Sequence, residues 1–299
     1  MTRPLIFMDP FPRNEAMVYT PDCASALDNL GEVVAHWGSR APDDLVESHL
    51  NRMTIIIGQT AMQRDRLDRA PNLRAILNVK ANWEPNIDYE ACRARGIYVL
   101  SAAPAMAPAV AEYCLAQAIL SLRGLGNADT LFRSGNEAYG IAGNRKAKSL
   151  YGSNVGLVGY GNLGRALVPL LRPFGVKLKV YDPWLSDGYL LSEGLHPAGL
   201  DEAISNSDVL FLLAGVTNEN EGFLNRKKLS KICEDATVVL ASRAEILAFD
   251  DFLDLADSGA FRAVVDVFPE EPVPLDSHWR KAKNTLFSSH LAGGLATSY

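Results

Sequence analysis

Short apolar runs separated by helical patterns recur along most of the chain. An apolar run of four to eight residues is typical of a strand buried on both faces of a parallel sheet. The first third of the sequence predicts strands at 5–8, 32–37, 54–57 and 97–100, and helices at 22–30, 62–69 and 89–95. The segment 72–79 is expected to hold a helix end and a further strand. Strands that alternate with helices indicate an α/β unit over residues 1–101.

The alternation resumes after residue 152. The expected strands are 155–158, 176–181, 207–213, 237–240, 263–267 and 285–288, and helices are expected at 163–174 and 249–257. Between the two parts, the Ala/Pro-rich segment 101–108 is expected not to be helical throughout and to act as a hinge. A long apolar-rich helix at 110–123 and a helix with a polar connection at 124–152 follow.

The strongest motif of the chain is VGLVGYGNLGRAL at 155–167, which combines a strand, a glycine turn and the start of a helix. The turn has the G-x-G-x-x-G spacing of dinucleotide-binding folds. Gly159 permits the tight turn, Gly161 permits close approach of a pyrophosphate, and Gly164 permits close packing of helix on strand. The helix N-terminus offers amide groups and a positive dipole end to phosphate.

A carboxylate follows the next predicted strand. Asp182 ends the run 176–181, about twenty residues beyond the motif, where an acid accepts hydrogen bonds from the adenosine ribose. Its charge repels a 2′-phosphate, which favours NAD over NADP. A glycine-rich turn of another α/β protein and the nucleotide loop of a methyltransferase are the alternative interpretations, and the strand, helix and Asp182 context favours dinucleotide binding.

Composition narrows the class of protein. The 299 residues suffice for about two domains, with 48% hydrophobic and 21% charged residues and a net charge of −6. The acidic balance disfavours nucleic acid, and no apolar stretch is expected to approach the length of a membrane span. The N-terminus lacks the pattern of a secretory signal. No C-x-x-C is present, so neither a metal site nor a disulfide framework is expected, and a cytoplasmic location is favoured. The four cysteines are Cys23, Cys92, Cys114 and Cys233.

Three ionisable residues follow strands of the glycine-motif unit. Arg243, Glu271 and His290 come after the strands predicted at 237–240, 263–267 and 285–288. Ligands of open parallel sheets bind at the carboxyl ends of strands. Arg243 can hold a carboxylate by a bidentate fork and polarise a keto oxygen. His290 can exchange a proton with that oxygen, and Glu271 would orient the ring and favour imidazolium.

Each of these three residues could also have a role outside catalysis. Arg243 could be a surface salt-bridge partner, Glu271 could belong to a solvated loop, and His290 could be a structural histidine. The remaining histidines show no matching constellation and are interpreted as ordinary; they are His36, His49, His196 and His278.

Several motifs in order show a resemblance to a known family. From about residue 78 to residue 294 the chain resembles the D-isomer-specific 2-hydroxyacid dehydrogenases. The matching segments are NIDYEACRARGIYVL, PAVAEYCLAQAILSLRG, VGLVGYGNLGR with VYDP, SDVLFLLAGVTNENEGFLN, VVLASRAEIL, AVVDVFPEEPVP and FSSHLAGG.

The resemblance implies a role for each matching residue. Arg243 stands at the substrate-binding arginine, Glu271 at the glutamate that tunes the histidine, and His290 at the acid/base histidine. Asp266 matches the contact to the nicotinamide carboxamide, and Thr217 matches the loop that faces the adenosine. The full cofactor-binding set is then Gly159, Gly161, Asn162, Leu163, Gly164, Asp182, Thr217, Ala241, Asp266 and Gly293.

The resemblance also implies an architecture. It predicts a smaller flavodoxin-like substrate-binding domain at 1–101, either alone or with 291–299, and a doubly wound Rossmann NAD-binding domain at 102–290. The family is usually dimeric through the cofactor domain, so a homodimer without a metal is expected.

The chain departs from the family pattern in three places. The usual A-R-G reads Ser242-Arg243-Ala244, and the chain ends at Tyr299, where the family normally continues. The family's substrate loop normally holds two glycines, and the resemblance aligns Ala81 and Trp83 with them. We expect Lys80, Ala81 and Asn82 to bind substrate with Arg243. We hypothesise that Lys80 supplies a cation for the substrate carboxylate or a second anionic group, the alternative being a lysine that points to solvent.

The leading interpretation is an NAD-dependent D-2-hydroxyacid dehydrogenase that interconverts a small 2-keto acid and its D-2-hydroxy acid. An NADH-sensing binding protein of the corepressor type on the same fold is the alternative from another class. Oxidation of a non-carbon acid such as phosphite is a third interpretation.

Overall fold

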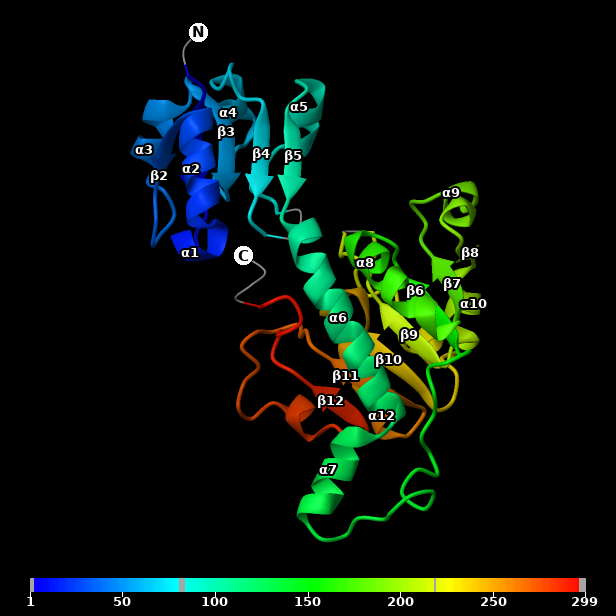
Figure 1. Cartoon of the computed structure of the whole chain (residues 1–299). Helices are drawn as coiled ribbons and strands as arrows, with labels where there is room; N and C mark the ends of the chain where they lie inside the picture. Colours follow the sequence, from blue (N-terminus) through cyan, green and yellow to red (C-terminus); the bar gives the residue numbers. More distant parts are fainter. Residues whose placement is uncertain (1–2, 81–83, 218, 296–299) are drawn as a thin grey trace. The chain divides into compact units, whose positions relative to one another are not determined.

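The computed structural model describes residues 3–80, 84–217 and 219–295 of the chain. The chain forms two compact units: residues up to Met106 together with Leu295, and Ala107–Gly294. Each unit is built around one parallel sheet, of five and of seven strands within the described residues (Figure 1). The predicted α/β class with two parallel sheets is confirmed.

The first unit has the strand order β2-β1-β3-β4-β5, which is the flavodoxin-like order. Its strands are β1 (Leu5–Asp9), β2 (Glu32–Ala35), β3 (Met53–Gly58), β4 (Ala75–Asn78) and β5 (Tyr98–Ser101). Its helices are α1 (Glu15–Val18), α2 (Pro21–Leu30), α3 (Asp43–His49), α4 (Arg64–Asp68) and α5 (Tyr89–Ala94). Phe7, Ile56 and Ile76 from three neighbouring strands are fully buried in the core of this unit.

Local signals in the sequence account for the helix ends. Thr20 caps α2, and Pro21 occupies its first position, where no N–H is needed. Asp88 caps α5 by accepting a hydrogen bond from the backbone N–H of Ala91 at 2.8 Å. Gly96 follows α5 at φ +68°, a left-handed conformation that glycine adopts without strain.

The second unit has the strand order β12-β11-β10-β9-β6-β7-β8, and every pairing is parallel. Counted from β6, this is the Rossmann order with one further strand at the β12 edge. The strands are β6 (Asn154–Val158), β7 (Lys177–Tyr181), β8 (His196–Pro197), β9 (Val209–Leu212), β10 (Ala236–Leu240), β11 (Phe261–Val265) and β12 (Thr285–Phe287). The helices are α6 (Ala103–Leu122), of which the residues from Ala107 on belong to this unit, α7 (Leu125–Arg133), α8 (Asn162–Leu171), α9 (Asp187–Ser192), α10 (Leu200–Ser205), α11 (Arg226–Leu229) and α12 (Phe249–Asp257).

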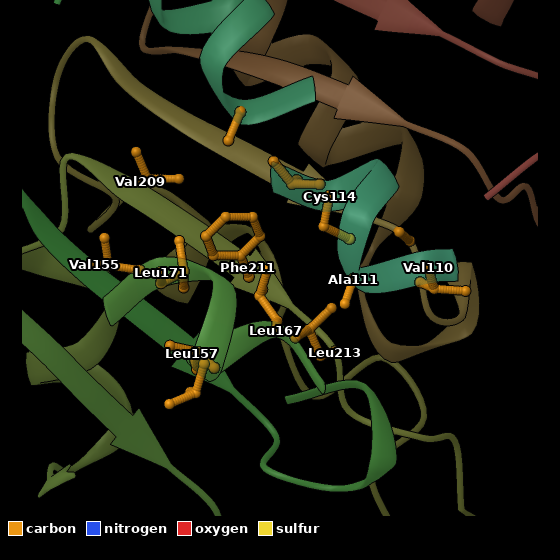
Figure 2. Packing of buried hydrophobic residues seen from close by; sticks show 14 of the residues in the cluster. Val110, Ala111, Cys114, Val155, Leu157, Leu167, Leu171, Val209, Phe211 and Leu213 are labelled. Atoms are coloured by element: carbon orange, nitrogen blue, oxygen red, sulfur yellow. The ribbon is translucent and has the colours of Figure 1, made fainter. Parts of the chain in front are cut away.

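The residues of β9 show why continuous apolar runs predict this sheet. Val209 and Phe211 face one hydrophobic cluster, whereas Leu210 and Leu212 face another. Figure 2 shows the first cluster, in which Phe211 lies among side chains from the strands and from helices α6 and α8. Successive side chains of a strand point to opposite faces, so a strand buried on both faces must be apolar at every position.

Helix α6 corrects two expectations. It begins at Ala103 rather than at residue 110, so most of the predicted hinge is helical. Pro104 lies in the first turn, where a backbone N–H would have no helical partner, so the proline removes no hydrogen bond. Pro108 is exposed and is tolerated within an alanine-rich helix. Its 20 residues are also long and apolar enough for a membrane span, contrary to expectation. The side chains Ala107, Ala111, Cys114, Ala118 and Leu122 are nevertheless buried in the second unit.

Candidate active site

The glycine turn lies at the point where the strand order of the second unit reverses. β6 pairs with β7 on one side and with β9 on the other. Gly159 has φ +96°, and a Cβ there would lie 2.7 Å from the Cα of Ala214, just beyond β9. A Cβ on Gly164 would lie 3.0 Å from the carbonyl oxygen of Gly159. The protein's own packing therefore excludes a side chain at Gly159 and leaves only tight room for one at Gly164.

Gly161 differs, since a Cβ there would meet no described protein atom within 4 Å. Its φ of −79° is one that any residue adopts, so the fold itself does not require glycine at this position. The open space faces the start of α8, which begins at Asn162 and continues through Leu163. No side chain among the described residues caps this helix. The amides of its first turn are thus free of side-chain acceptors, which suits a pyrophosphate.

Asp182 follows β7 and lies beside the glycine turn. Its Oδ2 accepts a hydrogen bond from the backbone N–H of Tyr160 at 2.8 Å, and its Oδ1 accepts one from Trp184 at 3.0 Å. Each carboxylate oxygen retains a second lone pair. Asp182 thereby orders the loop and still offers acceptors for ribose hydroxyls.

The other predicted cofactor residues lie along the same edge of the sheet. Thr217 is exposed beyond β9, and its backbone N–H donates to Asn220 Oδ1 at 2.6 Å. Ala241 is buried directly after β10. Gly293 is half-buried in the segment that follows β12.

His290 and Glu271 form a pair. Nδ1 of His290 lies 2.7 Å from Oε2 of Glu271, and Oε1 of Glu271 accepts a hydrogen bond from the backbone N–H of Phe268 at 2.9 Å. Glu271 therefore fixes the orientation of the imidazole and leaves Nε2 as the nitrogen that can exchange a proton. The His290 side chain is 49% exposed, so a small molecule can reach it.

Asp266 holds the turn that carries His290. This residue follows β11 and is completely buried. Its carbonyl oxygen accepts from the N–H of His290 at 2.8 Å, and its carboxylate accepts from the N–H groups of Leu291 and Ala292, each at 2.9 Å. His290 has φ +54°, a left-handed backbone that costs a non-glycine residue about 1–2 kcal/mol. Three consecutive N–H groups bonded to one residue offset that cost.

Arg243 lies at the same edge of the sheet as His290. Leu240 pairs in register with Val265, which pairs with Phe287. Arg243 lies three residues after Leu240, and His290 lies three residues after Phe287. Their strands, β10 and β12, are separated by β11. Neighbouring strands are about 4.8 Å apart, so the ends of β10 and β12 that lead to Arg243 and His290 lie about 10 Å apart. Arg243 Nη1 donates to the carbonyl oxygen of Ser242 at 2.6 Å, and its side chain is half-buried.

A cavity of about 820 Å³ adjoins the histidine. Glu271 and His290 contribute its polar wall. The remaining lining is mostly apolar and comprises Phe268, Pro272, Val273, Trp279, Phe287 and Leu291, together with Arg280, Ser288 and Ser289. Such a wall offers apolar surface to a ligand beside the imidazole.

The predicted substrate loop is described only in part. Ala81 and Asn82 lie outside the described residues, as does Trp83. Lys80 ends the described part, and its Nζ lies 3.3 Å from Oε1 of Glu84 with the side chain 41% exposed. Lys80 thus forms an exposed ion pair in the first unit.

The sequence did not predict the part that two hydroxyl groups, of Ser288 and Tyr113, play beside the site. Ser288 Oγ donates to Oδ1 of Asp266 at 2.5 Å, and the hydroxyl of Tyr113 is hydrogen-bonded to Ser288 Oγ. Ser288 lies within the FSSH motif, two residues before the histidine, which was the available signal. Tyr113 is 175 residues away from Ser288 in the sequence, and no local sequence pattern points to Tyr113.

Together these features define a dinucleotide-binding oxidoreductase unit, with an acid/base pair, an arginine and a phosphate-binding helix at one edge of a parallel sheet. A family model described as the D-isomer specific 2-hydroxyacid dehydrogenase NAD binding domain matches residues 115–292. The chain therefore belongs to the D-isomer specific 2-hydroxyacid dehydrogenase family. NAD(H) is its cofactor, as the glycine motif and Asp182 predict.

Relatives of known structure or name agree with this assignment. The chain is 36% identical to a phosphoglycerate oxidoreductase from Rhizobium etli, with a TM-score of 0.86 over 99% of this chain and 90% of that one. It is 25% identical to a hydroxypyruvate reductase from Blautia hydrogenotrophica over 89% of this chain and 84% of the relative. It is 27% identical to a glyoxylate reductase from Thermofilum pendens over 76% of this chain and 67% of the relative.

Proposed function

We propose that the protein reduces a small 2-keto acid to the D-2-hydroxy acid with NADH, or catalyses the reverse oxidation, and that His290 is the general acid/base. The observation that carries this proposal is the 2.7 Å contact between His290 Nδ1 and Glu271 Oε2 at the strand edge where a dinucleotide binds. The names of the hydroxypyruvate reductase, the glyoxylate reductase and the phosphoglycerate oxidoreductase support the substrate class.

The residues divide the chemistry among them. The glycine turn and Asp182 would hold NADH, which when bound would supply a hydride for the carbonyl carbon of the substrate. Arg243 binds the substrate carboxylate through its guanidinium fork and polarises the neighbouring keto oxygen. His290 donates a proton from Nε2 to that oxygen, and Glu271 holds Nδ1 so that the ring stays oriented. In the reverse direction the same imidazole removes the hydroxyl proton.

A substrate panel tests the proposal. Glyoxylate, hydroxypyruvate and pyruvate are offered with NADH and NADPH in parallel, and the configuration of the product is determined. We expect turnover of at least one acid, with NADH preferred and a D product. Tight NADH binding without turnover of any acid would favour the sensor alternative. NAD⁺ reduction by phosphite alone would favour the third interpretation, and a clear NADPH preference would contradict the role given to Asp182.

We further propose that the protein is a homodimer in a reducing, cytoplasmic environment. Several large apolar side chains on and after α7 are exposed, among them Leu125, Phe132, Tyr139 and Ile141. Such surface is typical of a contact with another protein. All four cysteines are free thiols, which fits a reducing compartment. Light scattering of the purified protein tests the dimer, and a monomeric mass at micromolar concentration would contradict it.

A further inference from the structure

A chain of hydroxyl groups links helix α6 to the turn that carries His290. The hydroxyl of Tyr113, on α6, is hydrogen-bonded to Ser288 Oγ, which lies just after β12. Ser288 Oγ in turn donates to Oδ1 of Asp266 at 2.5 Å. Three side chains that are far apart in sequence thus form one connected path ending at the residue that holds the histidine turn.

The direction of these hydrogen bonds follows from which groups carry a proton to donate. Ser288 has a single hydroxyl proton, and Asp266 Oδ1 accepts it, because a carboxylate is an acceptor only. Tyr113 must therefore donate to Ser288 Oγ. Burial raises the pKa of the Tyr113 hydroxyl to about 12, so the donor proton stays in place at every pH used for enzyme assays.

The turn depends on the far end of this path. Oδ1 of Asp266 also accepts from the N–H of Leu291, and Oδ2 accepts from that of Ala292. If the carboxylate rotates, both bonds are lost next to His290, whose backbone is in the left-handed region. Since Asp266 is completely buried, bulk solvent does not reach it to replace them.

We propose that Tyr113 is a positioning residue for proton transfer: through Ser288 it locks the Asp266 carboxylate, and thereby the turn that presents His290 to the substrate. This inference rests on the proposed role of His290. Tyr113 lies on another element of the same unit and acts without touching the imidazole. Its removal should consequently affect the proton-transfer step more than the binding of the keto acid.

The test is steady-state kinetics of Tyr113→Phe, which keeps the ring in the core and removes only the hydroxyl. We expect kcat to fall about three- to tenfold, the range associated with one hydrogen bond, while KM for the keto acid stays unchanged. The basic limb of the pH–rate profile should move to lower pH, because the loosened turn holds the protonated imidazole against Glu271 less well. Unchanged kcat and an unchanged profile would overturn the proposal.

A double-mutant cycle tests the route. If Tyr113 acts only through Ser288, the variant Tyr113→Phe/Ser288→Ala should be no slower than Ser288→Ala alone. Independent, multiplying losses would mean that Tyr113 influences the active site by another route and would overturn the proposal.

Ser121→Ala is the matched control, because it removes another buried hydroxyl of α6. Ser121 Oγ lies 3.2 Å from Thr237 Oγ1, near the amino end of β10 and so at the edge of the sheet opposite to His290. This variant should lower the midpoint of thermal unfolding and leave the pH–rate profile unchanged. A profile that moved equally in both variants would assign the effect to general loosening of α6 and would overturn the proposal.

His290→Gln distinguishes a failure of the positioning role from a failure of the proposed function. Normal turnover in that variant would remove His290 from the mechanism and with it the proposed function. If His290→Gln is inactive while Tyr113→Phe behaves as wild type, only the positioning role fails.

Discussion

The carboxylate of Glu271 holds the imidazole of His290 by its Nδ1 atom, and the same carboxylate is itself fixed by the backbone N–H of Phe268. The pair is therefore oriented through Nδ1, which leaves Nε2 as the nitrogen that can exchange a proton. A histidine that both donates and accepts a proton in a catalytic cycle needs this arrangement, because the ring must return to the same orientation in each protonation state.

The first prediction concerns this pair. His290→Gln should lower kcat by about 10²–10⁴, the usual contribution of general acid–base catalysis. Glu271→Gln keeps a hydrogen bond to the ring but removes the charge, so we expect a smaller loss and a pH–rate profile displaced toward acid. Stopped-flow measurement of NADH oxidation at several pH values checks both variants. Near-normal turnover of His290→Gln would contradict the assignment.

The second prediction concerns Arg243. Arg243→Gln removes the charge that polarises the keto oxygen, and we expect kcat to fall by about 10²–10³, as for other lost electrostatic contacts to a developing oxyanion. KM for the keto acid should also rise, because the carboxylate loses its partner. Arg243→Lys keeps the charge without the fork and should be less impaired. Equal kcat values for Arg243→Gln and wild type would place Arg243 outside the site.

Part of this site can be predicted from sequence because its residues follow strands. The apolar runs before Arg243 and His290 give the strands, and parallel strands bring their carboxyl ends to one edge. The turn around Asp266 could not be predicted in this way. It depends on hydrogen bonds between Asp266 and residues that follow the next strand, and no local periodicity encodes such a pairing.

The error at α6 has a different physical origin. Two prolines in a short segment predict a helix break when each is considered alone. In the structure Pro104 lies in the first turn, and the ring of Pro108 faces outward from a helix whose alanines pack into the core. Tertiary packing compensates for one missing hydrogen bond, a balance that propensity cannot reveal.

The third prediction separates the glycines of the dinucleotide motif. Gly161→Ala adds a methyl group where no described protein atom lies within 4 Å, so folding should be unaffected. That methyl group would occupy the space of the pyrophosphate, and we expect the Kd for NADH to rise at least about tenfold, or about 1.4 kcal/mol.

Gly159→Ala is the comparison, because it meets the backbone of Ala214 and has φ +96°. It should lower the unfolding midpoint, since a residue forced into this backbone region costs about 1–3 kcal/mol before the clash is counted. Calorimetry with and without NADH checks both variants. An unchanged NADH affinity in Gly161→Ala would contradict the placement of the pyrophosphate.

The fourth prediction concerns Lys80. If its cation binds the substrate, Lys80→Met should raise KM for the best keto acid. Lys179→Met is the control, because Lys179 also forms an ion pair, with Glu202 at 2.6 Å, on the strand β7. It should have normal kinetics. Unchanged KM and kcat in Lys80→Met would assign Lys80 to the exposed pair with Glu84 alone.

The fifth prediction concerns Cys114, which lies next to Tyr113 on α6 and is completely buried. Burial raises the pKa of this thiol from 9.0 to about 12, with the negative charge of Asp266 contributing in the same direction. A raised pKa means that the folded protein retains a proton that the unfolded chain has lost. The stabilisation is therefore fully present below pH 9 and is lost as pH rises from 9 toward 12.

Between these limits the free energy of unfolding should fall by about 1.4 kcal/mol per pH unit because of Cys114 alone. Cys114→Ala removes the titrating group, so its stability should decline less steeply above pH 9, whatever its stability at neutral pH. Urea unfolding under reducing conditions from pH 8 to pH 10.5 measures both slopes. Cys23→Ala, which removes an exposed thiol, should retain the slope of the wild type. Parallel slopes for wild type and Cys114→Ala would show that the thiol is not held protonated by the core.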